Sequence, residues 1–187
     1  VSQATPTITG FTVSAKTFGI APYTITAPTT NSAGAFTYTS DNTAVATVAG
    51  NVVTIIGAGS STITASQAST TNYTSATITA SLVVNPATPT ITNFSIPIKT
   101  VVNDPFTITA PTTNSTGAFT YTSSNTSVAT INQYIITIVG AGTTTITAVQ
   151  AGASNYTTAS ISAPFTVTPA TGVLSNFSVP AKINSLA

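Results

Sequence analysis

Few side chains in this sequence could carry out chemistry. Charged residues make up 3% of the chain, and His, Cys and Glu do not occur. The charged residues are Lys16, Asp41, Lys99, Asp104 and Lys182. General acid–base catalysis needs a titratable group with a tuned pKa, and a Ser or Thr nucleophile needs a base beside it. The sequence therefore predicts no catalytic residue and no enzyme activity.

Asparagine offers the chain its sites for modification. Asn-x-Ser/Thr sequons, which can accept N-linked glycans, lie at Asn72, Asn93, Asn114, Asn125, Asn155 and Asn176. Glycans would hydrate a surface that has very few charged side chains. A chain this rich in Ser and Thr also forms several sequons by chance, so unmodified surface asparagines are the alternative.

Charge and hydropathy exclude two classes of function. The formal net charge is +1, and the chain has no Arg. Binding of nucleic acid through its phosphates needs clustered basic residues, which this sequence lacks. No apolar run approaches the length of a membrane-spanning helix, about 18 residues or more. We expect neither a nucleic-acid partner nor insertion into a membrane.

The sequence consists mainly of one segment that occurs twice. Residues 4–86 return as residues 87–169 without an insertion or deletion, at a period of 83 residues. Gly57-Ala58-Gly59, for example, returns as Gly140-Ala141-Gly142. Self-similarity of this kind indicates a tandem-repeat architecture, with one small domain in each copy. We call the two copies the first and the second repeat.

Both ends of the chain fall in the middle of a repeat. Residues 1–3 match the end of a preceding repeat, and residues 170–187 match the first strand of a third. We therefore expect the chain to belong to a longer array. A lone first strand has neither a core nor a hydrogen-bonded ladder, so it must pair with another module or subunit. The residues expected to make this contact are Leu174, Phe177 and Val179.

No residue set for a metal or a cofactor is present. Ca²⁺ sites need several oxygen ligands, including carboxylates. The segments where the repeats meet, Asn85-Pro86 and Thr168-Pro169, contain none. Gly57-Ala58-Gly59 is followed by neither a Lys nor a helical pattern, so it is expected to be a turn rather than a phosphate-binding loop.

Each repeat alternates apolar and polar residues between turn signals, which is typical of half-buried strands. In the first repeat the expected strands are residues 7–13, 23–26, 35–40, 45–48, 52–56, 61–65 and 78–84. Short strands without any helical period indicate an all-β sandwich of about seven strands per repeat. The predicted core is Ile25, Phe36, Tyr38, Ile63, Ile78 and Leu82, with Ile108, Phe119, Tyr121, Ile146, Ile161 and Phe165 in the second repeat.

Two segments carry a family resemblance. Tyr38–Val48, followed by Gly57–Ala65, resembles the signature of bacterial Ig-like repeats of the invasin/intimin (BIG-like) type. Asn72-Tyr73 and Val84–Ala87 resemble related repeats of very large bacterial surface proteins, and similar repeats occur in large DNA viruses and their phages. Tyr38 stands where the family often has Trp. The resemblance implies tandem Ig-like sandwiches on a cell surface, a surface appendage or a virion surface.

Three roles follow from the repeat and the resemblance. The first is a non-enzymatic stalk or fibre that projects or supports adhesion, with Pro-containing junctions that favour extended geometry. The second is a self-assembling filament or capsid-surface subunit, completed by strand addition between subunits. The third is a glycan- or receptor-binding module. The expected partners are neighbouring Ig-like repeats or identical subunits, with surface glycans or receptors reached through domains outside this sequence.

Overall fold

The computed structural model describes residues 2–172 and residue 178, and the structural statements below concern these residues. Within them all regular structure is β, in short antiparallel and parallel pairs, and no helix is present. This confirms the all-β, Ig-like sandwich class. The chain divides into two compact units, of which the first comprises Val1–Asn93, Pro111–Thr120 and Val149–Ile161. Phe177, Val179, Leu174 and Asn176 lie outside the described residues, so their expected roles stay predictions.

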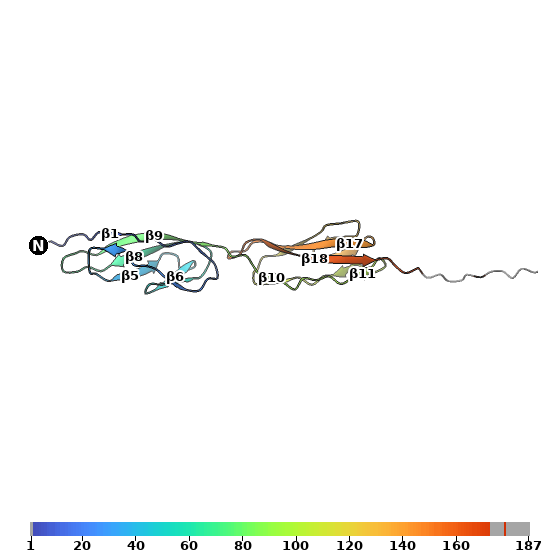
Figure 1. Ribbon diagram of the computed structural model, residues 1–187, viewed down its shortest axis with the longest axis horizontal. Coiled ribbons are helices and arrows are strands. Elements are labelled where there is room, and N and C mark those ends of the chain that lie inside the picture. The colour runs from blue at the N-terminus through green and yellow to red at the C-terminus, as the bar shows by residue number, and fades with distance from the viewer. Residues whose placement is uncertain (1, 173–177, 179–187) are drawn as a thin grey trace, which may run out of the picture. The chain divides into compact units, whose positions relative to one another are not determined.

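The first repeat builds three small sheets. Several of their strands are labelled in Figure 1. Its strands are β1 (Ile8–Thr9), β2 (Lys16–Thr17), β3 (Tyr23–Thr24), β4 (Thr29–Thr30), β5 (Phe36–Ser40), β6 (Ala46–Ala49), β7 (Val52–Ile55), β8 (Gly59–Gln67) and β9 (Ala76–Asn85). One sheet has the order β2-β9-β8-β5, a second has the order β3-β7-β6, and β1 pairs with β4.

The second repeat has the same strand order 83 residues later. Its strands are β10 (Ile91–Thr92), β11 (Lys99–Thr100), β12 (Phe106–Thr107), β13 (Thr112–Thr113), β14 (Phe119–Ser123), β15 (Ala129–Asn132), β16 (Ile135–Ile138), β17 (Gly142–Gln150) and β18 (Ala159–Thr168). Its sheets have the orders β11-β18-β17-β14 and β12-β16-β15, and β10 pairs with β13.

The long strands follow directly from the alternation in the sequence. In β8, residues 61, 63, 65 and 67 are buried while their neighbours are partly exposed. The antiparallel register pairs Ile63 with Ala80 and Ser61 with Leu82 in β9. Because side chains alternate across a strand, one face of this pair is directed into the sandwich.

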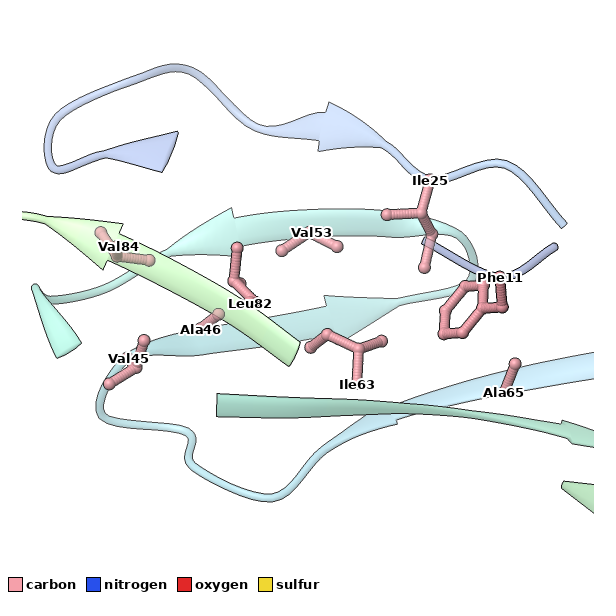
Figure 2. Close-up of a cluster of buried hydrophobic side chains, with 9 residues drawn as sticks. All are labelled: Phe11, Ile25, Val45, Ala46, Val53, Ile63, Ala65, Leu82 and Val84. Atoms are coloured by element: carbon pink, nitrogen blue, oxygen red, sulfur yellow. The ribbon is translucent and has the colours of Figure 1, made fainter. Parts of the chain in front are cut away.

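A compact apolar cluster fills the first repeat (Figure 2). It contains Phe11, Ile25, Val45, Ala46, Val53, Ile63, Ala65, Leu82 and Val84. Phe36, Tyr38 and Ile78 are partly buried and pack against this cluster. The predicted core is therefore correct, with its aromatic members at the margin rather than at the centre. The core also contains residues that the sequence analysis did not predict, including Phe11, Val45, Ala46 and Val53.

The core of the second repeat repeats this pattern. Its buried members are Ile96, Ile108, Val128, Ala129, Ile136, Ile146, Ala163, Phe165 and Val167. Tyr121 packs against the cluster, and Phe119 and Ile161 are partly buried. Phe165 is fully buried where the first repeat has Leu82, and its ring lies 5.7 Å from that of Phe106.

The first two expected strands are shorter in the structure than the sequence predicts, and further short strands follow each of them. The segment 7–13 pairs with β4 only through β1, and the chain then crosses to β9 as β2. Gly10, at φ +73°, starts this crossing, and Asn93 holds the equivalent position at φ +59°. Left-handed geometry costs Gly and Asn least. The second expected strand, residues 23–26, is shortened to β3, and β4 begins after the buried Pro28.

Candidate interaction sites

A buried glutamine organises one end of each repeat. The Gln67 side chain, 1% exposed, receives a 2.9 Å hydrogen bond at Oε1 from the Thr30 hydroxyl. Its Nε2 donates to the carbonyls of Ser32 and Gly34, at 3.0 and 2.9 Å. The amide therefore ties the turn after β4 to the end of β8 through one buried and two partly buried hydrogen bonds.

The second repeat builds the same arrangement around Gln150. Its Oε1 accepts from the Thr113 hydroxyl at 2.8 Å, and its Nε2 donates to Ser115 and Gly117 carbonyls at 3.1 and 2.9 Å. The turn approaches the next strand so closely that a Cβ on Gly117 would lie 1.8 Å from the Ala151 carbonyl oxygen. Both features are structural, because they are enclosed by the chain's own groups.

A polar cavity lies where the chain crosses between sheets in the first repeat. It measures about 190 Å³, and its walls include Lys16, Tyr23, Thr12, Ser14, Thr24 and Thr26. The Lys16 ammonium sits 4.6 Å from the centre of the Tyr23 ring, a cation–π contact. The Tyr23 hydroxyl is buried without a hydrogen-bond partner in the described structure, and burial raises the pKa of Tyr23 above 10.0. Lys99 and Phe106 repeat the contact at 4.9 Å without a hydroxyl.

Most of the sequon asparagines in the described part of the chain have structural bonds. Asn93 Nδ2 donates to the Thr112 hydroxyl at 3.3 Å. Asn114 Oδ1 accepts from Thr90 N at 2.9 Å, and Asn125 Oδ1 accepts from Ser127 N at 3.1 Å.

The same bonds occur in the first repeat without a sequon. Asn31 Oδ1 accepts from Thr7 N at 2.9 Å, and Asn42 Oδ1 accepts from Ala44 N at 3.2 Å. Neither asparagine has a Ser or Thr two positions later, as a sequon requires, because Ala33 and Ala44 stand there. Turn and strand geometry therefore accounts for asparagine at these positions, and glycan attachment stays a prediction.

The Asn-Tyr loop before the last strand occurs in both repeats. In the first, Ala4 N donates to Asn72 O at 2.9 Å and Thr74 N donates to Ala4 O at 2.9 Å. In the second, Ala87 bonds in the same way with Asn155 O and Thr157 N, at 2.9 and 2.8 Å. The entry to each repeat is thus fixed to this loop. Asn72 is exposed, whereas Asn155 is partly buried.

Within the first compact unit, the Asn155 loop contacts the Gly57-Ala58-Gly59 turn. Asn155 Oδ1 accepts a 2.8 Å hydrogen bond from Ala58 N. The Tyr156 ring meets the Phe18 ring edge-on, with centroids 5.5 Å apart and an interplanar angle of 83°. A turn that could have been mistaken for an anion site therefore donates to an asparagine side chain.

The arrangement offers no catalytic constellation in the described residues. No group of three or more His, Cys, Asp or Glu side chains that could hold a metal occurs within residues 2–172. Asp41 lies in the β5–β6 loop, where its Oδ1 accepts from Thr62 N at 2.7 Å and from the Ser61 hydroxyl at 2.9 Å. The described chain includes no helix with the length and hydropathy of a membrane span.

No protein-family model and no curated protein sequence matches the chain. Among solved structures it is similar to human protocadherin-24 EC1-2, at 13% identity and a TM-score of 0.36 over 89% of this chain and 99% of that one. The S-layer protein SbsC, domains 4 and 5, gives 22% identity and a TM-score of 0.32, covering 71% of this chain and 70% of that one.

A further similar structure is a SusE-like, surface-located polysaccharide-binding protein from the Bacteroides thetaiotaomicron heparin utilisation locus. It gives 15% identity and a TM-score of 0.34, and the match covers 87% of this chain but only 34% of that one. Likenesses this distant assign the chain to no family and to no function. The resemblance to BIG-like repeats accordingly stays a prediction.

Proposed function

We propose that the chain is a non-enzymatic structural part of an extracellular stalk or fibre, built from tandem Ig-like repeats, that carries tension between its ends. The domains would be residues 4–86 and 87–169, with residues 1–3 and 170–187 belonging to neighbouring repeats. The observation that carries this proposal is the parallel pairing of an early and the last strand in each repeat.

In the first repeat β2 pairs in parallel with β9, Lys16 opposite Val84 and Thr17 opposite Asn85. Phe18 N extends the pairing with a 2.9 Å hydrogen bond to Asn85 O. β2 follows the entry of the chain and β9 precedes its exit. A pull on the two ends therefore draws these neighbouring strands in opposite directions along their axes. Their hydrogen bonds are loaded together in shear rather than opened one at a time.

The second repeat has the same pairing. Lys99 lies opposite Val167 and Thr100 opposite Thr168 in β11 and β18. Val101 N donates to Thr168 O at 3.1 Å, and the Thr168 hydroxyl donates to Lys99 O at 3.2 Å. Two repeats of different sequence thus keep one arrangement that suits a chain held under tension.

Single-molecule force spectroscopy tests the proposal. We expect two unfolding events, each releasing roughly 300 Å of extended chain for an 83-residue repeat. Val101→Pro removes the N–H that bonds to Thr168, so it should lower the unfolding force of one event and leave the other unchanged. Val101→Ala removes the same exposed side chain but keeps the N–H, and it serves as the control. Equal forces for the two variants would refute a tension-bearing role.

The strand-addition alternative depends on Leu174, Phe177 and Val179, which the structure does not describe. Strand addition therefore stays a prediction. Deletion of residues 170–187 tests it, and an assembly that persists after the deletion would reject it. A glycan- or receptor-binding role gains no specific support from the sites above.

A further inference from the structure

The Asn155 loop shows what an Asn-Tyr loop of this fold can hold. Asn155 Oδ1 accepts a hydrogen bond from the N–H of Ala58. Gly57 and Gly59, on either side of Ala58, have no side chain that would obstruct this approach. The contact is close: the Asn155 Oδ1 atom lies 3.3 Å from the place a Cβ on Gly57 would take. Together with the Tyr156–Phe18 ring contact, one polar and one apolar interaction define this mode of docking.

The corresponding loop of the first repeat is built in the same way and is open. Ala4 bridges Tyr73 in parallel, as Ala87 bridges Tyr156. Asn72 and Tyr73, with Ser2, Ala4 and Thr71, line a cavity of about 490 Å³. The backbone that positions Asn155 is thus present around Asn72, and the Asn72 side chain is exposed.

The complementary turn is also present and exposed in the second repeat. Gly140-Ala141-Gly142 matches Gly57-Ala58-Gly59, and Ala141 and Gly142 are exposed whereas Ala58 is partly buried. Gly142 keeps the geometry of its counterpart: Gly142 has φ +143° and Gly59 has φ +141°. Val101, which takes the place of Phe18, is 36% exposed and supplies an apolar surface.

We propose that the Asn72-Tyr73 loop is a docking socket for another copy of this repeat, and that it receives the Gly-Ala-Gly turn of that copy. For the isolated chain the occupant is the Gly140-Ala141-Gly142 turn of a second molecule. The Asn72 Oδ1 accepts from the Ala141 N–H, and Tyr73 packs against Val101. This inference deepens the proposed array, because it names the surface by which one repeat engages the next. The contact is small, so it binds weakly between molecules and strongly when a linker raises the local concentration.

Engineered cysteines can test the socket, because the chain has none of its own. The variant Ala58→Cys with Asn155→Cys tests the contact seen within the chain. It should form an intramolecular disulfide under mild oxidation, and failure to do so would remove the basis of the inference. The variant Thr71→Cys with Ala141→Cys tests the proposed docking, because Thr71 is exposed, lines the same cavity and leaves Asn72 and Tyr73 intact. It should give a ladder of disulfide-linked oligomers.

The matched control is Thr37→Cys with Ala141→Cys, which moves one thiol to an exposed position on β5. Both double variants have two exposed thiols, so random collision gives them equal cross-linking. We expect the Thr71 variant to form oligomers at least about fivefold faster, because docking raises the effective thiol concentration. Equal rates in the two variants, or no ladder at all, would overturn the socket. The force measurement above uses neither thiol pair, so the tension-bearing function can fail or stand independently.

Discussion

The Asp41 carboxylate accepts a 2.7 Å hydrogen bond from the backbone N–H of Thr62 at an exposed corner of the first repeat. In the second repeat Ser124 takes its place, and its hydroxyl oxygen accepts from Thr145 N at 2.9 Å. One backbone donor is thus satisfied by a titratable group in the first repeat and by a neutral group in the second. The pair provides a natural comparison for the effect of charge.

The first prediction concerns pH. The Thr62 backbone N–H, and then the Ser61 hydroxyl, hold the pKa of Asp41 below its ordinary value of 3.8. Because the pKa is lower in the folded state, Asp41 stabilises the fold fully above its unfolded pKa. That stabilisation is lost as the pH falls from about 4 through the folded pKa. Urea unfolding of the wild type and of Asp41→Ser, measured from pH 7 down to about 2.5, should show their midpoints converging in this range. A difference that does not change with pH would contradict the assignment.

The second prediction concerns the buried glutamines. Gln67→Ala leaves the carbonyls of Ser32 and Gly34 and the Thr30 hydroxyl without their buried partner. We expect the unfolding free energy of the first repeat to fall by about 2–4 kcal/mol. Gln3→Ala is the control: Gln3 donates to Thr70 O at 2.7 Å but is exposed, and its loss should cost no more than about 0.5 kcal/mol. Urea denaturation would measure both, and similar effects would show that burial of Gln67 is not decisive.

The third prediction uses the unpartnered hydroxyl of Tyr23. Tyr23→Phe installs the residue that the second repeat has at this position, Phe106, and removes a buried polar atom that has no hydrogen bond to any residue the structure describes. It should leave the stability unchanged or raise it by up to about 1 kcal/mol. The reverse change, Phe106→Tyr, should lower it. Thermal unfolding followed by circular dichroism decides the sign, and a clear loss for Tyr23→Phe would reveal a hydrogen bond to water.

The fourth prediction concerns the close approach at Gly117. Its Cβ would lie 1.8 Å from the Ala151 carbonyl oxygen, a backbone atom that cannot turn away. Ala151 is itself fixed, because its N–H donates to Ala118 O at 2.9 Å. Gly117→Ala should therefore cost at least about 2–3 kcal/mol. A Cβ on Gly172 would have no atom of the described residues within 4 Å, so Gly172→Ala should be nearly neutral. Comparable melting temperatures for the two variants would show that the turn can move at little cost.

The sequence was sufficient for the β architecture because its alternation is strict where strands are long. Ile63 and Leu82 could be placed in the core since β8 follows period two from Ser61 onward and β9 over its whole length. The division of the first strand was harder to foresee. Only the pair Gly10 and Asn93, two residue types that tolerate left-handed geometry, indicates where the chain leaves one sheet for the other.

The glutamines were missed for a different reason. Gln67 continues the inward phase of Ser61, Ile63 and Ala65, so a pattern based on hydropathy ends just before it. Its recurrence as Gln150, which is also buried at the end of β17, could have indicated a structural role for this residue. The turn it closes could not be derived, because the bonds to Ser32 and Gly34 depend on the tertiary approach of a loop distant in sequence.

The difference between Leu82 and Phe165 affects how the chain can fold wrongly. Neighbouring repeats of similar sequence can exchange equivalent strands during folding. Such exchange leaves tandem-repeat proteins in misfolded states. In the second repeat Phe165 lies against Phe106, whereas the first repeat has the smaller Leu82 with Tyr23. If β18 replaced β9, it would force a large ring into the smaller core, and the reverse exchange would leave a void. Divergence at one buried position thus favours correct pairing while the backbone stays the same.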